Sequence, residues 1–511
     1  MTTRTGYDVV LFADAGSVAH SRSLGPYRVA TELRKQGFTV KVVDHFSSWL
    51  SNFKDFFKLI NLIVDQKTLF IGFSGSTFNN TTSNEKSNIQ RFSDYLSANR
   101  SMAAWPVDDN KITVLFAQIK KQFPNVKLVY GGSGAENKIH HLREHIDFLV
   151  QGYAEHSVVQ LARHLSDGTN KISYLPVGKL KLINYDITAA EFDFRNHGAT
   201  IYETSDILMR DEMLYMEVSR GCMFKCGFCS YPMLGRGKNN YAYHKSIDVL
   251  ADEFKRNYDL AGITKYSFID SIFNETTEKI QDVLRARDQS GVDINFTAFL
   301  RYELLARYPE QIQLLKELGL KIANLGIESL HTPSARTVGK GTDSEKVKDI
   351  LYDLKAQWGN DIPISGSFII GLPHETLETL EKWVPWVLNK DSPIILGYIF
   401  PLSFSNGAVF SESPEKYGYT VDGDQWKNDY WDYNSAEKYV TDLRTECWNS
   451  GSLRFTGFEF MMMMGLGYDT KFLTETGLNK IPWSEVQEKN QSRWNSYRDS
   501  TFAHETSKNN K

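Results

Sequence analysis

The sequence is poor in cysteine and contains no long apolar run. Four cysteines among 511 residues do not form a disulfide framework, and no hydrophobic stretch reaches the roughly 20 residues that a membrane-spanning helix needs. The net charge of −4 gives no reason to expect binding to nucleic acid or to a membrane surface. The first residues lack the apolar core of a signal peptide, so we expect a cytoplasmic protein whose thiols stay reduced.

What is present is typical of a folded chain, with 41% apolar, 23% charged and 13% aromatic residues. At roughly 150 residues per domain, the length predicts two to four domains. The patterns along the chain divide it into a Rossmann-like domain at 1–168, a linker at 169–206, a partial barrel at 207–405 and a C-terminal part at 406–511. We expect the last part to be a small helical cap that ends in a flexible tail from about Ala503.

The first part alternates short apolar strands with helices. The strands are predicted at 9–12, 39–43, 69–74, 126–130 and 147–150, and helices at 26–36, 112–123 and 155–165. Apolar strands separated by helices predict a parallel sheet covered on both faces. Ligands of such sheets bind beyond the C-terminal strand ends. The residues at those ends are small or polar, and include Ser74, Ser76, Gly131, Gly132 and Gly152.

Two other regions need an interpretation. The polar segment 78–110 is long for a connection, and we favour a lid over a disordered loop. The region 207–405 contains six strand–helix units, with strands near 213–219, 265–270, 295–301, 322–328, 364–371 and 394–401. Six units are too few for a closed eight-unit barrel, so we predict an open (β/α)6 partial barrel. The expected fold class is therefore α/β in both domains.

Three of the four cysteines form a C-x3-C-x2-C run at Cys222, Cys226 and Cys229, directly after the first barrel strand. Three thiolates this close can hold one metal centre, and they leave a four-iron cluster with an open iron that can bind a substrate or cofactor. Loops at this end of a barrel carry its chemistry. The alternative is a zinc knuckle, but zinc favours a fourth nearby ligand, and His244 and Cys447 are distant in sequence.

This spacing, with the aromatic Phe228 before the third cysteine, resembles the radical S-adenosylmethionine (SAM) superfamily. The resemblance implies a [4Fe–4S] cluster on the three thiolates, SAM on the fourth iron, and reductive cleavage of SAM to a 5′-deoxyadenosyl radical. It also implies SAM contacts at the ends of later strands, by Asp270, Arg301, Glu328, Ser329, Gly371 and Pro373. For Asp270 and Arg301 the alternative is an ordinary ion pair.

The first domain resembles the cobalamin-binding domain that precedes many radical SAM barrels. The resemblance implies that its loops cradle a corrin, with contacts from Ser74, Ser76, Gly131, Gly132, Gly152 and Glu155. The chain departs from the D-x-H-x-x-G motif, because Asp14 and His20 are six residues apart, and we interpret His20 as a loop histidine. No G-x-G-x-x-G follows the first strand, so a nicotinamide site is not expected.

These observations favour a cobalamin-dependent radical SAM methyltransferase acting on an unactivated carbon or on phosphorus. The alternatives are a radical SAM rearrangement, cyclisation or oxidation with a scaffold first domain, and a non-catalytic iron–sulfur or zinc protein. The expected partners are a small-molecule or peptide substrate and a reductant such as flavodoxin or ferredoxin. Methylthiolation of tRNA is not expected, since no cysteine precedes Cys222, and Cys447 alone cannot hold a second cluster. We interpret Cys447 as a buried apolar residue.

Overall fold

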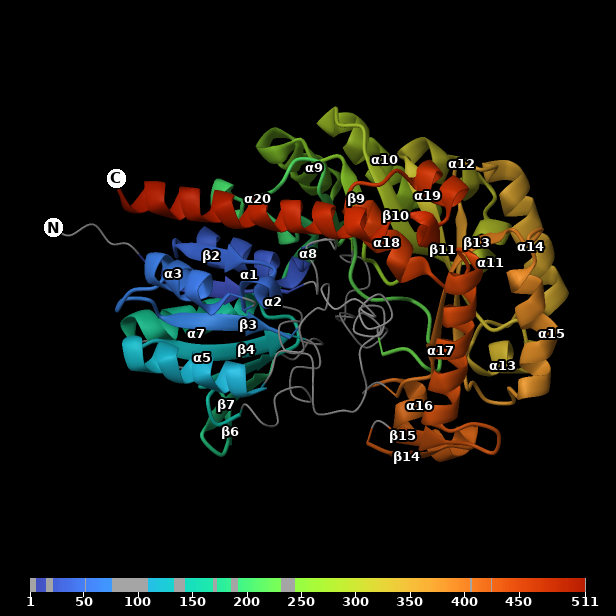
Figure 1. The fold of residues 1–511 in the computed structure, drawn as a ribbon, viewed down its shortest axis with the longest axis horizontal. Helices are drawn as coiled ribbons and strands as arrows, with labels where there is room; N and C mark the ends of the chain where they lie inside the picture. The colour runs from blue at the N-terminus through green and yellow to red at the C-terminus, as the bar shows by residue number, and fades with distance from the viewer. Residues whose placement is uncertain are drawn as a thin grey trace.

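The computed structural model describes residues 6–14, 22–50, 52–75, 109–132, 143–168, 172–184, 192–230, 244–404, 407–423 and 425–510. Two lobes lie side by side in Figure 1, an N-terminal α/β lobe in blue and teal and a barrel lobe in green to orange. The loop residues Ser76 and His20 and almost all of the expected lid at 78–110 fall outside the described residues.

The first lobe is built on a seven-stranded sheet in the order β2-β1-β3-β4-β5-β7-β6. Its strands are β1 Val9–Phe12, β2 Val40–Val43, β3 Phe70–Ser74, β4 Lys127–Gly132, β5 Phe148–Gln151, β6 Leu175–Val177 and β7 Leu180–Asn184. All neighbouring pairs are parallel except β6 and β7. The fully buried strands β1 and β2 follow the expectation that parallel sheets read as continuous apolar runs.

Helices cover both faces of this sheet, as predicted. They are α1 Leu24–Lys35, α2 Phe46–Leu50, α3 Phe53–Ile63, α5 Asp109–Gln122 and α7 Glu155–Asp167. Tyr27 of α1 and Leu161 of α7 belong to one core cluster, whereas Phe56 of α3 and Phe116 of α5 belong to a second. The two clusters lie on opposite faces because successive strand side chains alternate between them.

The stretch 169–206, expected to be a linker with short irregular strands, contains two short strands that extend the first sheet. Strand β7 pairs in parallel with β5, with Leu149 opposite Leu182 and Val150 opposite Ile183, and β6 extends the same sheet. Lys181 lies between the buried Leu180 and Leu182 of β7, so the apolar pattern is too short to stand out in the sequence. The chain then passes through α8 (Phe194–His197) and the 3-10 helix η3 (Thr204–Asp206) into the barrel.

The second lobe is an open, six-stranded parallel sheet in the sequential order β13-β12-β11-β10-β9-β8, as predicted. The strands are β8 Met213–Met216, β9 Lys265–Phe268, β10 Asn295–Leu300, β11 Leu320–Glu328, β12 Ile364–Ile370 and β13 Ile394–Pro401. The helices that follow them are α9 Ile247–Ala261, α10 Thr277–Ser290, α11 Tyr302–Arg307, α12 Glu310–Leu318, α13 Thr332–Thr337, α14 Ser344–Trp358 and α15 Leu377–Leu388.

Local sequence explains where the barrel helices begin and end. The side chains of Ser246 and Thr276 accept a hydrogen bond from the third helical N–H of α9 and α10, which satisfies an otherwise unpaired donor. The same helices stop at Gly262 and Gly291, whose φ angles of +69° and +67° lie in the left-handed region that favours glycine.

The C-terminal part corrects a second prediction. It contains α16 Val409–Glu412, η5 Pro414–Tyr417, β14 Thr420–Asp422, β15 Gln425–Lys427, α17 Tyr433–Ser450, α18 Gly457–Gly465, α19 Thr470–Thr476, η6 Leu478–Lys480 and α20 Trp483–Asn509. The flexible tail predicted from about Ala503 is wrong, because α20 runs from the barrel lobe across the N-terminal lobe (Figure 1). Glu505 is fully buried there and pairs with Lys41 Nζ at 2.9 Å.

The reason α20 is hard to predict is that few apolar positions repeat along it. It is anchored by separate buried contacts: Tyr497 packs edge-on against His45, and Tyr7 Oη donates to Glu505 Oε2 at 3.0 Å. Within the described chain, none of the helices combines the length and hydropathy required to cross a membrane.

Candidate functional site

The three clustered cysteines lie on the loop that leaves β8, as expected. Cys222 is buried and Cys226 and Cys229 are half-buried, and none forms a disulfide. The loop turns tightly, because Cys229 N donates to Cys226 O at 3.0 Å. Phe228, on the same loop, is half-buried and packs against the main core. The sequence therefore brings three thiols to the C-terminal end of the barrel.

Three thiolates are the protein ligands that a four-iron cluster with one open iron requires. Among the residues that the structure describes, no three Cys, His, Asp or Glu side chains converge as the ligands of one metal ion do. In a four-iron cluster each thiolate binds a different iron, so the sulfur atoms need not meet at one point. Three thiols on one loop, with no carboxylate or imidazole among them, fit that arrangement.

Arg301 lies against the cysteine loop. Its Nη1 donates to Cys226 Sγ at 3.8 Å, its Nη2 donates to Glu303 Oε1 at 2.8 Å, and its guanidinium carbon lies 3.9 Å from the Phe224 ring centroid. Burial raises the pKa of the Cys222 thiol, an effect that the Phe224 backbone N–H and Arg301 oppose. A buried cation beside the sulfurs favours thiolates over thiols.

Asp270 is fully engaged within the protein. Its carboxylate accepts from Val218 N at 2.7 Å, from Ser219 Oγ at 2.8 Å and from Lys279 Nζ at 2.7 Å. These contacts occupy both oxygens and anchor the start of the cysteine loop to the end of β9. Asp270 therefore forms an ion pair with Lys279, which is the alternative that the sequence offered for this residue.

Glu328 ends β11 in an unusual conformation. Its φ angle is +68°, which a non-glycine residue seldom adopts. Its Oε1 lies 3.5 Å from Lys340 Nζ, and the same Nζ donates to Gly326 O at 2.8 Å. Burial raises the pKa of Glu328, although Lys340 and Arg301 oppose the shift. Strained, buried carboxylates of this kind are concentrated at functional sites.

Glu375 is a site residue that the sequence analysis did not select. Its Oε1 accepts from Ser329 Oγ at 3.1 Å and its Oε2 from Gly371 N at 2.9 Å, so it joins the ends of β11 and β12. It is fully buried, and burial raises its pKa to about 8. Pro373, between these residues, accepts from Ser334 Oγ at 2.7 Å through its carbonyl oxygen. In the sequence, Glu375 could have been recognised as a single glutamate directly after the apolar motif that ends β12.

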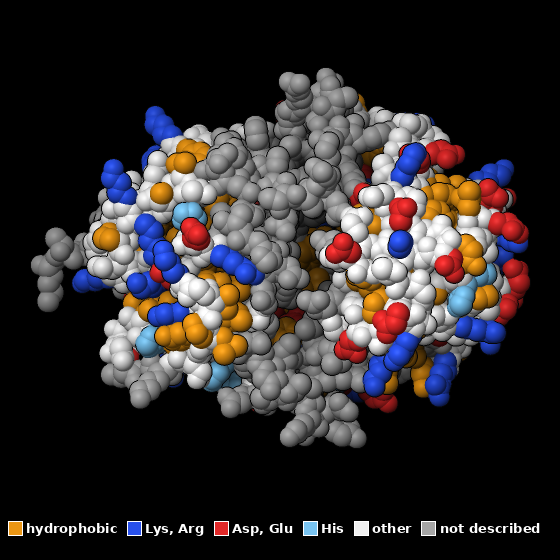
Figure 2. Space-filling model, turned by 90° about the horizontal axis from the view of Figure 1, so that it is seen from below, with side chains coloured by type: hydrophobic (Ala, Val, Ile, Leu, Met, Phe, Trp, Pro, Cys, Tyr) orange, Lys and Arg blue, Asp and Glu red, His pale blue; other side chains and the backbone are white. Residues whose placement is uncertain are grey.

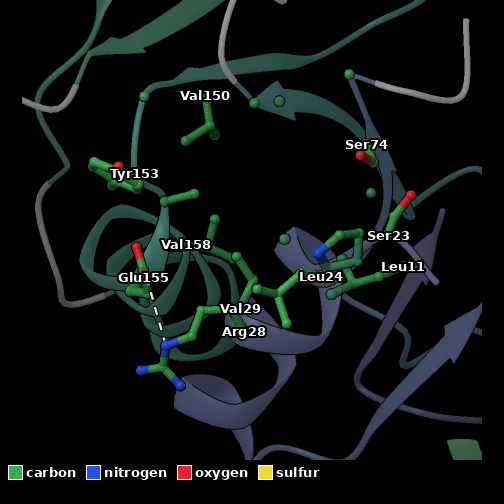
Figure 3. A pocket seen from close by; sticks show the side chains of 18 of the residues that line it. Leu11, Ser23, Leu24, Arg28, Val29, Ser74, Val150, Tyr153, Glu155 and Val158 are labelled. Atoms are coloured by element: carbon green, nitrogen blue, oxygen red, sulfur yellow. Dashed lines mark ion pairs between the residues drawn. The ribbon is translucent and has the colours of Figure 1, made fainter. Parts of the chain in front are cut away.

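A cavity of about 550 Å³ lies at the C-terminal strand ends of the first sheet. Figure 3 shows Leu11, Leu24, Val29, Val150 and Val158 around it, with Ser23 and Ser74 on one side and Tyr153 and Glu155 on the other. It is lined by five of the six residues expected to contact a corrin, namely Ser74, Gly131, Gly132, Gly152 and Glu155. The volume falls in the range of ligand pockets.

Glycine is required at this cavity for two reasons. Gly132 and Gly152 have φ angles of +126° and +76°, which other residues seldom adopt. A Cβ atom on Gly131 would lie 2.9 Å from Val150 O. The backbone can therefore approach a bound molecule closely on this side.

The far wall of the cavity comes from the barrel lobe. It is formed by Glu217, Ser219, Arg220, Gly221, Ile269 and Ser271, so the wall leads directly into Cys222. Burial alone would raise the pKa of Glu155, but Arg220 and Arg28 hold it below its usual value. Arg220 was also not selected from the sequence, because its carboxylate partner Glu155 is 65 residues away.

Figure 2 views the molecule from below the lobes of Figure 1. Basic and acidic side chains are interspersed over the right-hand lobe on this face, whereas the left-hand lobe shows mainly basic ones. The charges of mixed sign over the right-hand lobe give no single-sign field for steering a charged partner to that lobe.

Three comparisons place the chain among known proteins. Residues 216–387 match the family model described as the radical SAM superfamily. Over 174 residues the chain is 30% identical to an uncharacterised methyltransferase from Pyrococcus horikoshii, a match that covers 34% of this chain and 36% of the relative. Over 252 residues it is 26% identical to the anaerobic magnesium-protoporphyrin IX monomethyl ester cyclase of Rubrivivax gelatinosus, covering 46% and 44%. The chain thus spans less than half the length of these curated relatives.

Solved structures share the fold over most of the chain. The radical SAM methyltransferase TsrM from Kitasatospora setae, solved with tryptophan and a SAM analogue, aligns with a TM-score of 0.57 at 15% identity over 82% of this chain and 79% of that one. The cobalamin-dependent SAM radical enzyme OxsB, solved with aqua-cobalamin and SAM, aligns with a TM-score of 0.59 at 14% identity over 97% and 72%. At this identity the likeness concerns the fold.

Proposed function

We propose that the protein is a radical SAM enzyme that holds cobalamin between its lobes and methylates an unactivated centre, since residues 216–387 match the radical SAM superfamily model. The position of the cavity supports the proposal that a second cofactor is bound. The cavity of about 550 Å³ at the strand ends of the first sheet is closed on its far side by the segment that leads into Cys222. A ligand in this cavity lies between the two lobes, next to the cysteine loop.

In this proposal Cys222, Cys226 and Cys229 hold the [4Fe–4S] cluster. A reduced cluster with bound SAM supplies a 5′-deoxyadenosyl radical that can take a hydrogen atom from a substrate. Arg301 holds positive charge beside Cys226, and its Nε and Nη2 already bind the carboxylate of Glu303, so its proposed role is to supply positive charge beside the cluster. Asp270 fixes the loop through Ser219 and Val218, so we assign it a positioning role.

The ends of β11 and β12 are proposed to hold the rest of SAM. Glu328, Ser329, Gly371 and Pro373 follow these two strands, and Glu375 bonds both Ser329 and Gly371. A single buried carboxyl group therefore sets the spacing of the two strand ends. We expect the adenosine part of SAM to be oriented by this pair of loops.

In the first lobe, Ser74, Gly131, Gly132 and Gly152 are proposed to contact cobalamin, which supplies the methyl group when bound. The apolar wall and the glycine backbone suit a broad, flat ligand. Glu155 is already paired with Arg220 and Arg28, so its proposed role is to form the wall. The solved structures of similar fold support this assignment, since OxsB binds aqua-cobalamin and TsrM binds cobalamin and a [4Fe–4S] cluster.

Reconstitution tests the proposal directly. Protein reconstituted anaerobically with iron, sulfide and hydroxocobalamin is expected to keep corrin absorbance through gel filtration. Gly25 lines the cavity, and a Cβ atom on it would meet no other atom within 4 Å. Gly25→Leu should therefore fold but fill part of the cavity and lower the amount of corrin retained. Gly25→Ala is the control and should retain as much corrin as the wild type. Wild-type protein that loses all corrin on the column would refute cobalamin binding.

A second candidate is radical oxidation or cyclisation with the first lobe as a scaffold. The similarity to a magnesium-protoporphyrin IX monomethyl ester cyclase favours it. The two candidates differ in the products made from SAM, because methyl transfer from SAM releases S-adenosylhomocysteine. Formation of 5′-deoxyadenosine without S-adenosylhomocysteine in the presence of substrate would favour the second candidate. Either reaction needs an external one-electron reductant, for which flavodoxin and ferredoxin are the proposed partners.

A further inference from the structure

Arg220 connects the cysteine loop to the N-terminal lobe. It lies two residues before Cys222 and only 8% of it is exposed. Its Nε donates to Glu217 Oε1 at 2.9 Å, within the same loop, and its Nη2 donates to Glu155 Oε1 at the start of α7. One guanidinium group therefore makes charged hydrogen bonds to both lobes.

Aromatic rings enclose the same cation. The guanidinium carbon lies 4.0 Å from the ring centroid of Tyr153, 4.6 Å from that of Phe194 and 5.7 Å from that of Phe192. Tyr153 precedes α7 in the first lobe, whereas the two phenylalanines belong to the segment that joins the lobes. We call Arg220, Glu155, Glu217 and Tyr153 the Arg220 latch. The planar guanidinium of Arg220 can donate to two carboxylates and stack on aromatic rings at the same time, which the ammonium group of a lysine cannot do.

The rest of the cysteine loop is fixed to the barrel. Ser219 is bound by Asp270, Met223 N donates to Glu275 Oε1 at 2.8 Å, and Gly227 N donates to Val338 O at 3.2 Å. These bonds attach the loop to the barrel, and the latch adds a contact from the loop to α7. All four latch residues also line the cavity between the lobes.

We infer that Arg220 is a positioning residue, which sets the separation between the centre held by the cysteine loop and the ligand held in the first lobe. The inference rests on the proposed function for the identity of the two ligands. The statement that the latch holds the cysteine loop against α7 is independent of the proposed function. Two reactive centres that share one substrate need a fixed mutual placement, and small displacements lower rates strongly.

Two measurements test the latch on the full chain. The first is amide hydrogen exchange in wild type, Arg220→Lys, Glu155→Gln and the double variant. Exchange at 217–223 and at the start of α7 should rise by roughly tenfold or more in each single variant, as expected for loss of a hydrogen bond to a charged group. The effect in the double variant should be less than the sum of the two single effects, because both variants break the Arg220–Glu155 contact, although Glu155 also pairs with Arg28 and Arg220 with Glu217.

The second measurement is the electron–electron dipolar coupling between the reduced cluster and cob(II)alamin in reconstituted holoprotein. The coupling falls with the inverse cube of the separation, so a loosened latch should broaden the distance distribution. Arg34→Lys is the matched control, since Arg34 makes a buried fork to Asp206 at 2.8 Å away from the cavity. Arg34→Lys should leave both the hydrogen exchange at 217–223 and the cluster–cobalamin distance distribution unchanged.

The outcomes separate the inference from the proposed function. Wild-type protein without a cob(II)alamin signal refutes the proposed function, and exchange alone then decides the latch. Exchange at 217–223 that matches wild type in both single variants overturns the latch. An unchanged distance distribution in Arg220→Lys holoprotein overturns the positioning role. Single effects that add in full in the double variant also overturn it, because they show that Arg220 and Glu155 act through separate contacts.

Discussion

Replacement of Glu375 by glutamine should change how the stability of the protein depends on pH. Glu375 is fully buried and accepts hydrogen bonds from Gly371 N and Ser329 Oγ, and no cation is among the groups that shift its pKa. Glutamine has the same shape and its carbonyl oxygen can still accept from Gly371 N. The substitution therefore removes the titration and keeps the packing.

The magnitude follows from the shift in pKa. Burial raises the pKa of Glu375 from 4.5 to about 8. Between these values the folded state keeps a proton that the unfolded state has lost, so stability falls as pH rises, by about 1.4 kcal/mol per pH unit. The stabilisation is fully present below pH 4.5 and is lost as pH passes the folded pKa of about 8. Between pH 6 and 8 the loss is about 2 kcal/mol, because the slope flattens near the folded pKa.

Thermal unfolding of the two proteins at pH 6, 7 and 8 measures this difference. A change of about 2 kcal/mol in the free energy of unfolding moves the melting temperature of a domain of about 200 residues, such as the barrel lobe, by about 4–8 °C. The gap between Glu375→Gln and wild type should therefore widen by that amount as pH rises, in favour of the variant. Glu378→Gln is the control, since Glu378 is exposed beside Lys382 on the next helix. Parallel pH profiles for wild type and Glu375→Gln would refute the reasoning.

Two further predictions concern the cluster and the last helix. Cys226→Ala should abolish reductive cleavage of SAM and lower the bound iron, and cleavage at the wild-type rate would leave the non-catalytic iron–sulfur or zinc hypothesis standing. Glu505→Ala should leave Lys41 buried without its carboxylate partner, which costs about 3–5 kcal/mol for a broken buried ion pair. Faster hydrogen exchange along α20 and a lower urea midpoint are the expected results; an unchanged midpoint would show that α20 is held by other contacts.

The parts of the fold that follow from local pattern could be predicted from sequence. Both parallel sheets and the six barrel strands were predicted because buried strands form apolar runs bounded by glycine or polar residues. The position of Cys222, Cys226 and Cys229 at a strand exit followed from the same pattern. Strand β7, with Lys181 between its buried residues Leu180 and Leu182, lacks such a run, and its place in the first sheet was not predicted.

The parts that depend on distant partners could not be predicted. Arg220 is held by Glu155, Ser329 is joined to Gly371 through Glu375, and Lys41 meets its partner only in α20. A buried ion pair leaves no periodic trace in the sequence, since either partner alone resembles a surface residue. The same applies to α20, whose anchors are single polar contacts rather than an apolar stripe.

The contact between α20 and the first lobe has a consequence for how the chain matures during synthesis. Lys41 is 99% shielded from solvent, yet its carboxylate partner Glu505 is translated hundreds of residues later. N-terminal domains usually fold while the rest of the chain is still being made. Here the first lobe must keep an unneutralised ammonium group near water until the last helix arrives. We therefore expect the lobe to reach its final compact state only after α20 has been synthesised.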